Sequence, residues 1–248
     1  MAIGSSPFII PYFMPIWYNR DVTRESKNIL AFCAPFATWI GLQTLLPATA
    51  GTYALRSAAT LLVLLTVFLP RFRRQAESPS PRPGLFGASL WGLLGGLLVF
   101  ILWVVPEKST FYCTWCCWPL GSPPTPSTEP SPYDPAVCGW TLTLAKLIGS
   151  AFIIAPAEEI FFRSFLYRWL QKRDFLAVPR TNFDVSAFLW MVFLFLLEHD
   201  RPLAAALAGA IYGLLYIRCG LFAAILAHVL TNLLLALYVI VYGLWNFW

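Results

Sequence analysis

The sequence has few charged residues. Asp, Glu, Lys and Arg make up 12% of its 248 residues, while hydrophobic residues make up 58%. A soluble globular domain has about 25% charged and about 45–50% apolar residues. The shortage of charge therefore excludes an ordinary soluble domain. It predicts an all-α protein, a polytopic bundle of transmembrane helices.

The chain also has no basic face, although its formal net charge is +5. Its Lys and Arg residues lie mostly between apolar segments, where they orient a membrane protein. This distribution argues against a nucleic-acid partner and favours membrane lipids as the surroundings of the chain.

Seven apolar segments are long enough, or nearly long enough, to cross a membrane as helices. They are residues 29–45, 53–69, 85–105, 140–154 with a continuation through two glutamates, 183–197, 202–217 and 221–248. We expect about seven spans, within a range of six to eight, because the fourth contains Lys146 and an N-terminal arm could add one. Gly92 and Gly96, like Gly209 and Gly213, have a spacing that lets helices approach closely.

The basic residues predict an orientation. If the N-terminus is cytoplasmic, twelve Lys and Arg residues fall in cytoplasmic loops, and four lie in outer loops or in the outer parts of spans. The positive-inside rule therefore places the N-terminus in the cytoplasm and the loop 106–138 outside. The twelve residues are Arg20, Arg24, Lys27, Arg71, Arg73, Arg74, Arg82, Arg168, Lys172, Arg173, Arg180 and Arg218.

Two regions follow from this reading. Residues 1–138 form an N-terminal transmembrane region that ends in an outward loop, 106–138, which is rich in Cys and Pro. Residues 139–248 form a second transmembrane region that carries the chemically interesting residues. In an oxidising compartment we expect a disulfide within the set Cys113, Cys116, Cys117 and Cys138, while free thiols and a zinc site remain alternatives.

Only two histidines occur in the chain, and both follow residue 150. His199 ends the stretch FLLEH, which places Phe195 and His199 on one helical face. His228 opens HVLTN, which places His228 and Asn232 one turn apart on one face. The two histidines are therefore candidates for a shared polar site within the membrane.

Two adjacent glutamates open the stretch EEIFFR. Ionisable side chains inside a membrane are rare, and they usually mark a site within the bundle. Glu159 and Arg163 have the spacing of a helical ion pair, which favours a structural role. Glu158 is rotated by about 100° from Glu159, so it has no obvious partner on its own helix.

Together these side chains have the chemistry of peptide hydrolysis by water. A desolvated Glu or a neutral His can act as the base that activates the water. His and Asn side chains can donate to a developing oxyanion. This chemistry requires no Ser or Cys nucleophile, and we expect no metal and no cofactor.

The three motifs, in this order, resemble the type II CAAX prenyl endopeptidases and the related CAAX-protease and bacteriocin-processing (CPBP) membrane proteins. The resemblance covers about residues 140–240. It implies an intramembrane endopeptidase of the glutamate type that cleaves near the C-terminus of a membrane-tethered or lipid-modified protein. The branch that accompanies exosortase sorting systems is similar too, and it implies a bacterial inner membrane.

The resemblance also implies a role for each motif residue. Glu158 and His199 would activate the water, and His228 and Asn232 would stabilise the oxyanion. Glu159 and Arg163 would shape the site. The predicted orientation places three of the motif residues at different depths in the membrane, namely Arg163, His199 and His228. They can meet only if helices are tilted or offset, or if a funnel reaches the membrane midplane.

Three rival functions remain open. A metalloprotease would use Glu and two His as zinc ligands, but the chain has no His-Glu-x-x-His. A non-catalytic immunity factor or sorting partner would use the polar cluster to bind a ligand. A transporter would typically contain an internal repeat, and the sequence has none.

Overall fold

The computed structural model describes residues 16–72, 83–106 and 131–248, and the secondary structure of these ranges is helical throughout. The N-terminal arm and most of the predicted outward loop 106–138 lie outside the described residues. Within the described ranges, the all-α fold predicted from the sequence is confirmed.

Eleven stretches of α-helix follow one another along the described ranges. They are α1 (Ile16–Leu45), α2 (Ala50–Val63), α3 (Leu69–Phe72), α4 (Leu85–Val104), α5 (Pro135–Cys138), α6 (Trp140–Ile148), α7 (Ala155–Glu159), α8 (Tyr167–Gln171), α9 (Val185–Leu196), α10 (Pro202–Cys219) and α11 (Leu221–Tyr242). Three π-helical stretches, Leu64–Phe68, Gly149–Ile154 and Ile160–Leu166, join α2 to α3, α6 to α7 and α7 to α8. Short 3-10 turns occur at Phe175–Ala177 and Trp245–Phe247.

Six of the resulting helices are long and apolar enough to cross a membrane. They are Arg24–Leu45, Ala50–Phe72, Leu85–Val104, Trp140–Gln171, Pro202–Cys219 and Leu221–Tyr242. A shorter apolar helix, Val185–Leu196, accounts for the remaining predicted span. The described residues therefore form an integral membrane helix bundle, as predicted.

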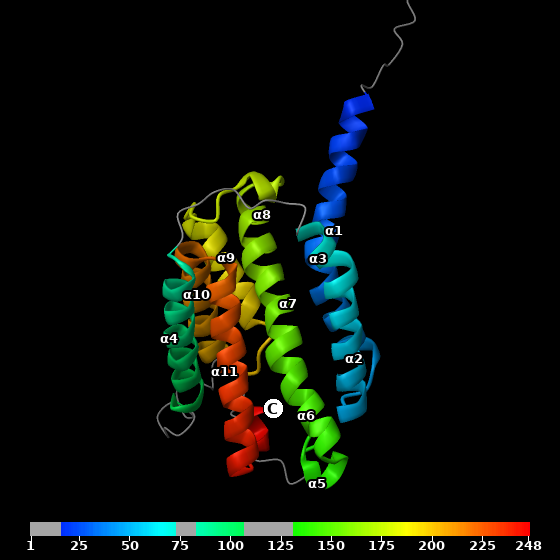
Figure 1. Cartoon of the computed structure of the whole chain (residues 1–248), viewed down its shortest axis with the longest axis vertical. Helices are drawn as coiled ribbons and strands as arrows, with labels where there is room; N and C mark the ends of the chain where they lie inside the picture. The colour runs from blue at the N-terminus through cyan, green and yellow to red at the C-terminus, as the bar shows by residue number, and fades with distance from the viewer. Residues whose placement is uncertain (1–15, 73–82, 107–130) are drawn as a thin grey trace, which may run out of the picture.

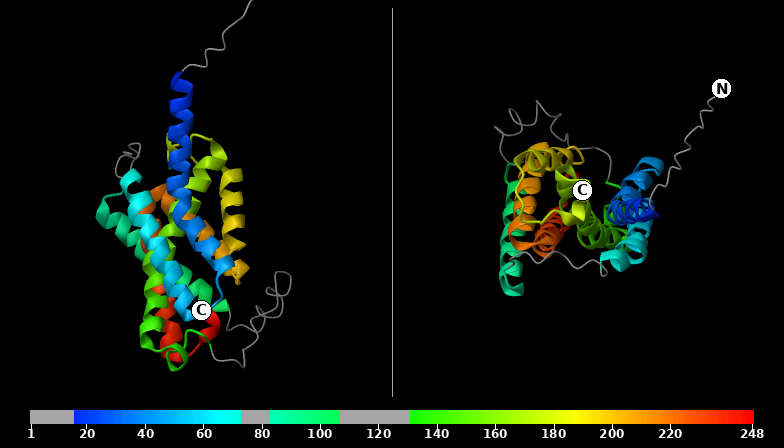
Figure 2. Two further views of the ribbon diagram at one scale, coloured as in Figure 1. Left: turned by 90° about the vertical axis from the view of Figure 1, so that its right-hand side faces the viewer. Right: turned by 90° about the horizontal axis from the view of Figure 1, so that it is seen from above.

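The long helix Trp140–Gln171 runs between two groups of helices. On one side lie α1 and α2, and on the other lie α4, α10 and α11 (Figure 1). The end-on view in Figure 2 shows the same arrangement, with α4 at one edge of the bundle and α1–α3 at the other. This central position surrounds the helix that carries both glutamates with protein on both sides.

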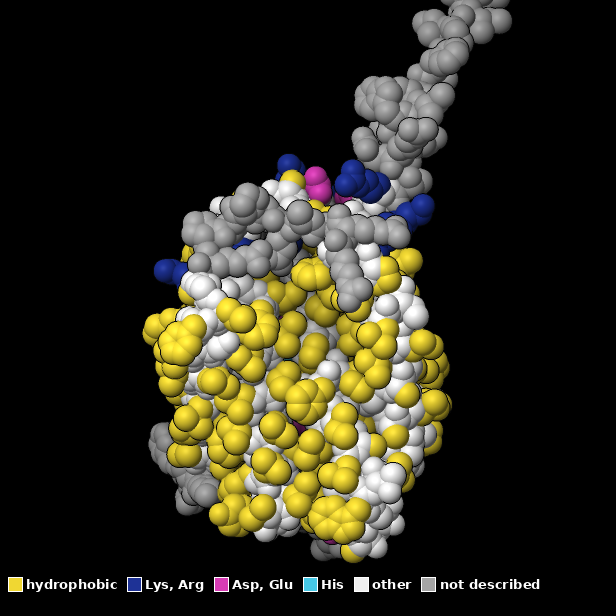
Figure 3. All heavy atoms as spheres, viewed as in Figure 1, with side chains coloured by type: hydrophobic (Ala, Val, Ile, Leu, Met, Phe, Trp, Pro, Cys, Tyr) yellow, Lys and Arg dark blue, Asp and Glu magenta, His cyan; other side chains and the backbone are white. Residues whose placement is uncertain are grey.

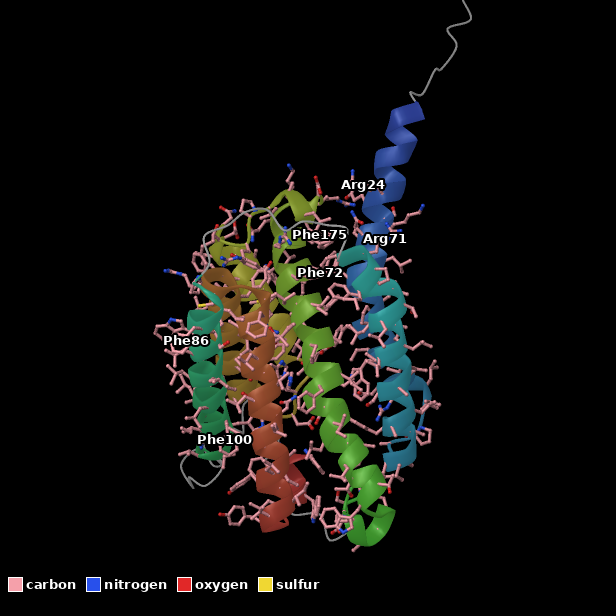
Figure 4. The ribbon with its side chains drawn as sticks, viewed as in Figure 1. Arg24, Arg71, Phe72, Phe86, Phe100 and Phe175 are labelled. Atoms are coloured by element: carbon pink, nitrogen blue, oxygen red, sulfur yellow. The ribbon has the colours of Figure 1, made fainter. Side chains whose placement is uncertain are left out.

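The two ends of the bundle differ from its sides. Hydrophobic side chains cover the side in view, whereas Lys and Arg side chains gather at one end (Figure 3). Arg24 and Arg71 lie at this end, together with Phe175 of the connection between α8 and α9 (Figure 4). Most Lys and Arg side chains visible on this face thus gather at one end of the bundle, which is the pattern that the positive-inside rule describes.

Specific residues set where helices begin and turn. Thr49 caps α2 through a capping box with Thr52, and the Asp184 carboxylate accepts from Ala187 N at the start of α9. Gly220, with φ +98°, connects α10 directly to α11. Because a positive φ strains residues with a Cβ, glycine permits this abrupt reversal.

The predicted close approach through Gly92 and Gly96 occurs between α4 and α11. A Cβ at Gly96 would lie 2.6 Å from the backbone oxygen of Ala227, and one at Gly92 would lie 2.9 Å from that of Ala223. The contact also lets Thr231 Oγ1 donate to Gly96 O at 2.9 Å. Small residues therefore fix α11, and with it the face that carries His228.

Candidate active site

The helix that carries the glutamates is not regular. Pro156 lacks an N–H and its ring crowds the preceding turn, which disfavours ordinary α-helical bonding upstream. The chain is π-helical just before this position, at Gly149–Ile154, and again after the glutamates, at Ile160–Leu166. Single π-helical turns inside α-helices frequently occur at functional sites. Here they flank α7, which contains Glu158 and Glu159.

Glu159 is the centre of a buried charge cluster. Arg163 Nη1 lies 3.0 Å from Glu159 Oε1, within ion-pair distance although not aligned for a hydrogen bond. Both side chains are fully buried. Arg163 Nη2 also donates to Gly209 O at 3.3 Å, and the guanidinium lies over the Phe195 ring. The predicted pair of Glu159 and Arg163 therefore forms in the core.

His228 connects the two glutamates. Its Nδ1 lies 2.9 Å from Glu159 Oε1, and its Nε2 lies 3.9 Å from Glu158 Oε2. Because an ionised carboxylate can only accept, the proton of the shorter contact belongs to Nδ1. The Tyr212 ring stacks on the imidazole ring of His228, and the two ring centroids are 4.7 Å apart. The imidazole is therefore held in one orientation between two carboxylates.

Glu158 differs from its neighbour in having no close partner. Its residue surface is 9% exposed, and Oε2 is buried without a hydrogen-bond partner among the described residues. The distance of 3.9 Å to His228 is too long for a direct hydrogen bond. Glu158 thus keeps a free acceptor at the site, and the sequence expectation that it lacks a partner on its own helix holds.

His199 lies in the turn after α9. That helix has 12 residues, about 18 Å at 1.5 Å per residue, and so is shorter than a bilayer core of about 30 Å. His199 Nδ1 donates to Phe195 O at 2.9 Å, because a carbonyl can only accept. Burial lowers the pKa of His199, outside the spanning helices, to about 4. The ring is therefore neutral near pH 7, with Nε2 available as an acceptor.

Asn232 lies one turn after His228 on α11. Its Nδ2 donates to Ser150 O at 3.1 Å, within the π-helical stretch Gly149–Ile154. An amide nitrogen carries two hydrogens, so this bond leaves one N–H available. The contact also shows what the π-helical turn does locally, since it presents a backbone carbonyl to a side chain of another helix.

One cavity of about 200 Å³ brings these residues together. Glu158, His199, His228 and Asn232 all line it. The short α9 accounts for the convergence that the predicted orientation required, because its end brings His199 into the depth of the bundle. Glu159 and Arg163 do not line the cavity. Glu159 contacts His228, and Arg163 pairs with Glu159.

The sequence did not single out several other side chains at the cavity. They are Trp103, Ser150, Tyr212, Thr231, Leu235, Phe247 and Trp248. Their residue types are common in membrane helices, so nothing in the sequence distinguished them. Lys146 also lines the cavity, and a lone lysine inside an apolar span was a signal that pointed to it.

The cysteine prediction is mostly beyond the described residues. Cys113, Cys116 and Cys117 lie outside them, and Cys138 has a free thiol, 3.4 Å from Thr143 Oγ1. The predicted disulfide therefore stays a prediction. Among residues 16–72, 83–106 and 131–248, no group of three His, Cys, Asp or Glu side chains is placed to hold a metal ion.

Residues 140–234 match the family model described as Type II CAAX prenyl endopeptidase Rce1-like. The match includes all three motifs, so the family recognised from them is confirmed over this segment. The family and the spanning helices support a CAAX-type membrane protease that acts on a protein substrate. No curated protein and no solved structure matches the chain. The match falls within the predicted second region, 139–248, while the division into two regions stays a prediction.

Proposed function

We propose that the protein is an intramembrane endopeptidase of the glutamate type. One observation carries the proposal. The His228 imidazole lies between the carboxylates of Glu158 and Glu159, at a cavity that His199 and Asn232 also line. Buried charges are costly in an apolar bundle, and a purely structural need would be met by the pair of Glu159 and Arg163 alone. The free acceptor of Glu158 therefore argues for chemistry.

In this proposal Glu158 takes a proton from the attacking water. Its Oε2 has no hydrogen-bond partner among the described residues, so it can accept from a water. His199 holds the same water through Nε2, because its Nδ1 is engaged by Phe195 O. The water oxygen then attacks the carbonyl carbon, and one water proton passes to the Glu158 carboxylate. When the resulting oxyanion collapses, the C–N bond breaks, and the Glu158 carboxyl gives this proton to the leaving amine nitrogen.

The oxyanion that forms would accept from His228 and Asn232. Asn232 supplies the N–H that is not used on Ser150 O. His228 can donate from Nε2 only if it carries both ring protons, as an imidazolium between the carboxylates. Donors fixed before the reaction stabilise such a charge without reorganisation. Glu159 and Arg163 act through His228 and are positioning residues.

The substrate and the orientation are part of the proposal. We infer a membrane-tethered or lipid-modified protein cleaved near its C-terminus, because the cavity lies within a bundle with an apolar surface. We also infer a cytoplasmic N-terminus, supported by the basic residues at one end of the bundle, and a bacterial inner membrane, which rests on the family resemblance alone. An impermeant maleimide should then label Ala136→Cys from outside, and Arg173→Cys only after the membrane is opened. The reverse pattern would overturn this orientation.

Cleavage by the purified protein tests the reaction class. A membrane-tethered peptide should be hydrolysed in nanodiscs, and a strong chelator should leave the rate unchanged. Loss of activity with chelator, restored by zinc, would identify a metalloprotease instead. Absence of cleavage, together with a cellular function that Glu158→Gln retains, would identify an immunity or sorting partner.

A further inference from the structure

Two cations accompany the site without a carboxylate beside them. Lys146 of α6 lines the cavity, and Arg56 of α2 is 4% exposed. Both contact the same ring, that of Tyr53. Among the described residues, neither Lys146 nor Arg56 has a carboxylate within the ion-pair distance of 4.0 Å.

Aromatic rings hold these cations in place. Lys146 Nζ lies 4.0 Å from the ring centroid of Tyr53, 4.6 Å from that of Tyr133 and 5.9 Å from that of Trp248. Arg56 lies 4.8 Å from the Trp39 centroid. Ring faces attract a cation but carry no net charge, so they do not neutralise it. The cage therefore holds both basic groups in place, and among the described residues no carboxylate neutralises them.

Arg56 has capacity left for a ligand. Its Nε is buried and has no hydrogen-bond partner among the described residues. A buried donor without an acceptor is costly, and so is a buried cation without an anion. Arg163 offers the contrast, because its charge is balanced by Glu159 at 3.0 Å. Arg163 is thus balanced by a carboxylate, whereas Lys146 and Arg56 have no such partner within the part of the chain that the structure describes.

We propose that Lys146, with Arg56 beside it, binds the free C-terminal carboxylate of the peptide substrate. This inference rests on the proposed function, because it takes the ligand of the cavity to be a peptide. A carboxylate would supply the missing negative charge and accept a charge-assisted hydrogen bond from the ammonium. Lys146 and Glu158 line one cavity, so one ligand can reach both.

The helix that carries both residues sets the length of the released peptide. Lys146 and Glu158 are separated by about 18 Å along the axis, at 1.5 Å per residue. An extended peptide covers about 3.3 Å per residue. This separation is an upper limit, because both side chains reach one cavity and the π-helical stretch Gly149–Ile154 is more compact, so the product released from the C-terminal side would contain up to about five residues.

A phospholipid headgroup offers similar oxyanion chemistry. Lys146 lies less than two turns from the start of α6 at Trp140, at the end of the bundle opposite the basic one. A phosphate could approach the cations from the membrane surface there. The experiment must therefore separate a substrate carboxylate from a lipid phosphate.

Paired peptides distinguish the two sources. A farnesylated peptide with five residues after the lipidated cysteine is prepared with a C-terminal carboxylate or a carboxamide. Binding is measured on the Glu158→Gln protein in phosphatidylcholine nanodiscs and in a maltoside detergent without phosphate. The carboxylate peptide should bind about 10- to 100-fold tighter in both, the usual value of a hydrogen bond between charged groups.

Variants assign this preference to Lys146. Lys146→Gln should remove it by weakening only the carboxylate peptide, whereas Lys146→Arg should retain it. Lys172→Gln makes the same change at an exposed position at the basic end and should alter nothing. The wild-type protein is also assayed with peptides that have different numbers of residues after the lipidated cysteine. The ratio of kcat/KM for the carboxylate over the carboxamide peptide should be largest near five residues.

Each outcome decides the inference. Equal binding of both peptides, or binding of neither, overturns it. An effect of Lys146→Gln that appears only in phospholipid, and is the same for both peptides, assigns the cations to lipid phosphate and overturns it too. A carboxylate preference with no cleavage by the wild-type protein would support the subsite and contradict the proposed endopeptidase.

Discussion

Two helices of this bundle cross the same apolar layer by opposite means. α4 contains no charged residue, and it packs against α11 through glycines that leave no room for a Cβ. The helix Trp140–Gln171 contains Glu158, Glu159 and Arg163 and is interrupted by π-helical turns. α4 is held by close packing and by the hydrogen bond that Gly96 O accepts from Thr231. The interrupted helix carries buried charge that is only partly balanced.

The two helices have separate roles in the site. The contact between α4 and α11 places the face of α11 that carries His228 and Asn232. The interrupted helix places the carboxylates against that face. One helix therefore supplies rigidity and the other supplies reactive groups, and substitutions in each should have different signatures.

Loss of the buried ion pair should have the largest effect on stability. Glu159→Gln leaves Arg163 as a fully buried cation without a counter-charge. Breaking one partner of a buried pair typically costs about 3–5 kcal/mol. Thermal unfolding in detergent should therefore occur at a clearly lower temperature, and activity should fall as well.

Asp174→Asn is the matched control, because it neutralises an exposed carboxylate at the basic end of the bundle. It should leave both thermal unfolding and activity unchanged. If Glu159→Gln were as stable as this control, the ion pair would not contribute to the fold.

The stability of α4 against α11 should be lowered by a single added methyl group. Gly96→Ala places a Cβ 2.6 Å from Ala227 O, so α4 and α11 must separate. Overpacking of this kind costs about 1–3 kcal/mol. We expect lower thermal stability and weaker activity, because His228 moves with α11.

Gly41→Ala makes the same change where no atom lies within 4 Å of the new Cβ. Alanine is favoured over glycine inside a helix by about 0.5–1 kcal/mol. This variant should be at least as stable as the wild-type protein. Equal destabilisation by both substitutions would refute the role of close approach at Gly96.

Substitution of the two histidines should have different effects on stability, smaller than those above but measurable. His228→Ala removes a hydrogen bond to buried Glu159, which costs about 1–3 kcal/mol. His199→Ala removes a bond to the Phe195 backbone and ring contacts with Phe195 and Trp103 in a half-buried turn, but no bond to a buried charge. Both should abolish cleavage of a membrane-tethered peptide, and only His228→Ala should also lower the unfolding temperature. Equal melting curves for the two variants would contradict this assignment.

Much of this arrangement could be predicted from the sequence. Apolar length gave the spans, and the spacing of Glu159 and Arg163 gave their ion pair. The contact of Glu159 with His228 could not be predicted, because it joins residues on different helices through the packing of α7 on α11. The end of α9 was predicted to within one residue, at Leu197 against Leu196, but its shortness relative to a bilayer and the placement of His199 at the cavity could not be predicted, because they depend on how the helices pack. The π-helical turns around Glu158 depend on tertiary packing as well as on Pro156.

Turnover by Glu158→Gln tests the central claim most directly. Glutamine keeps the size of the side chain but removes the proton acceptor, and a neutral amide costs less to bury than a carboxylate. The purified variant should unfold at the wild-type temperature or above it. Its rate on a membrane-tethered peptide should fall about 100-fold or more, the usual contribution of a positioned general base. A well-folded Glu158→Gln protein that cleaves at nearly the wild-type rate would contradict a glutamate-dependent mechanism.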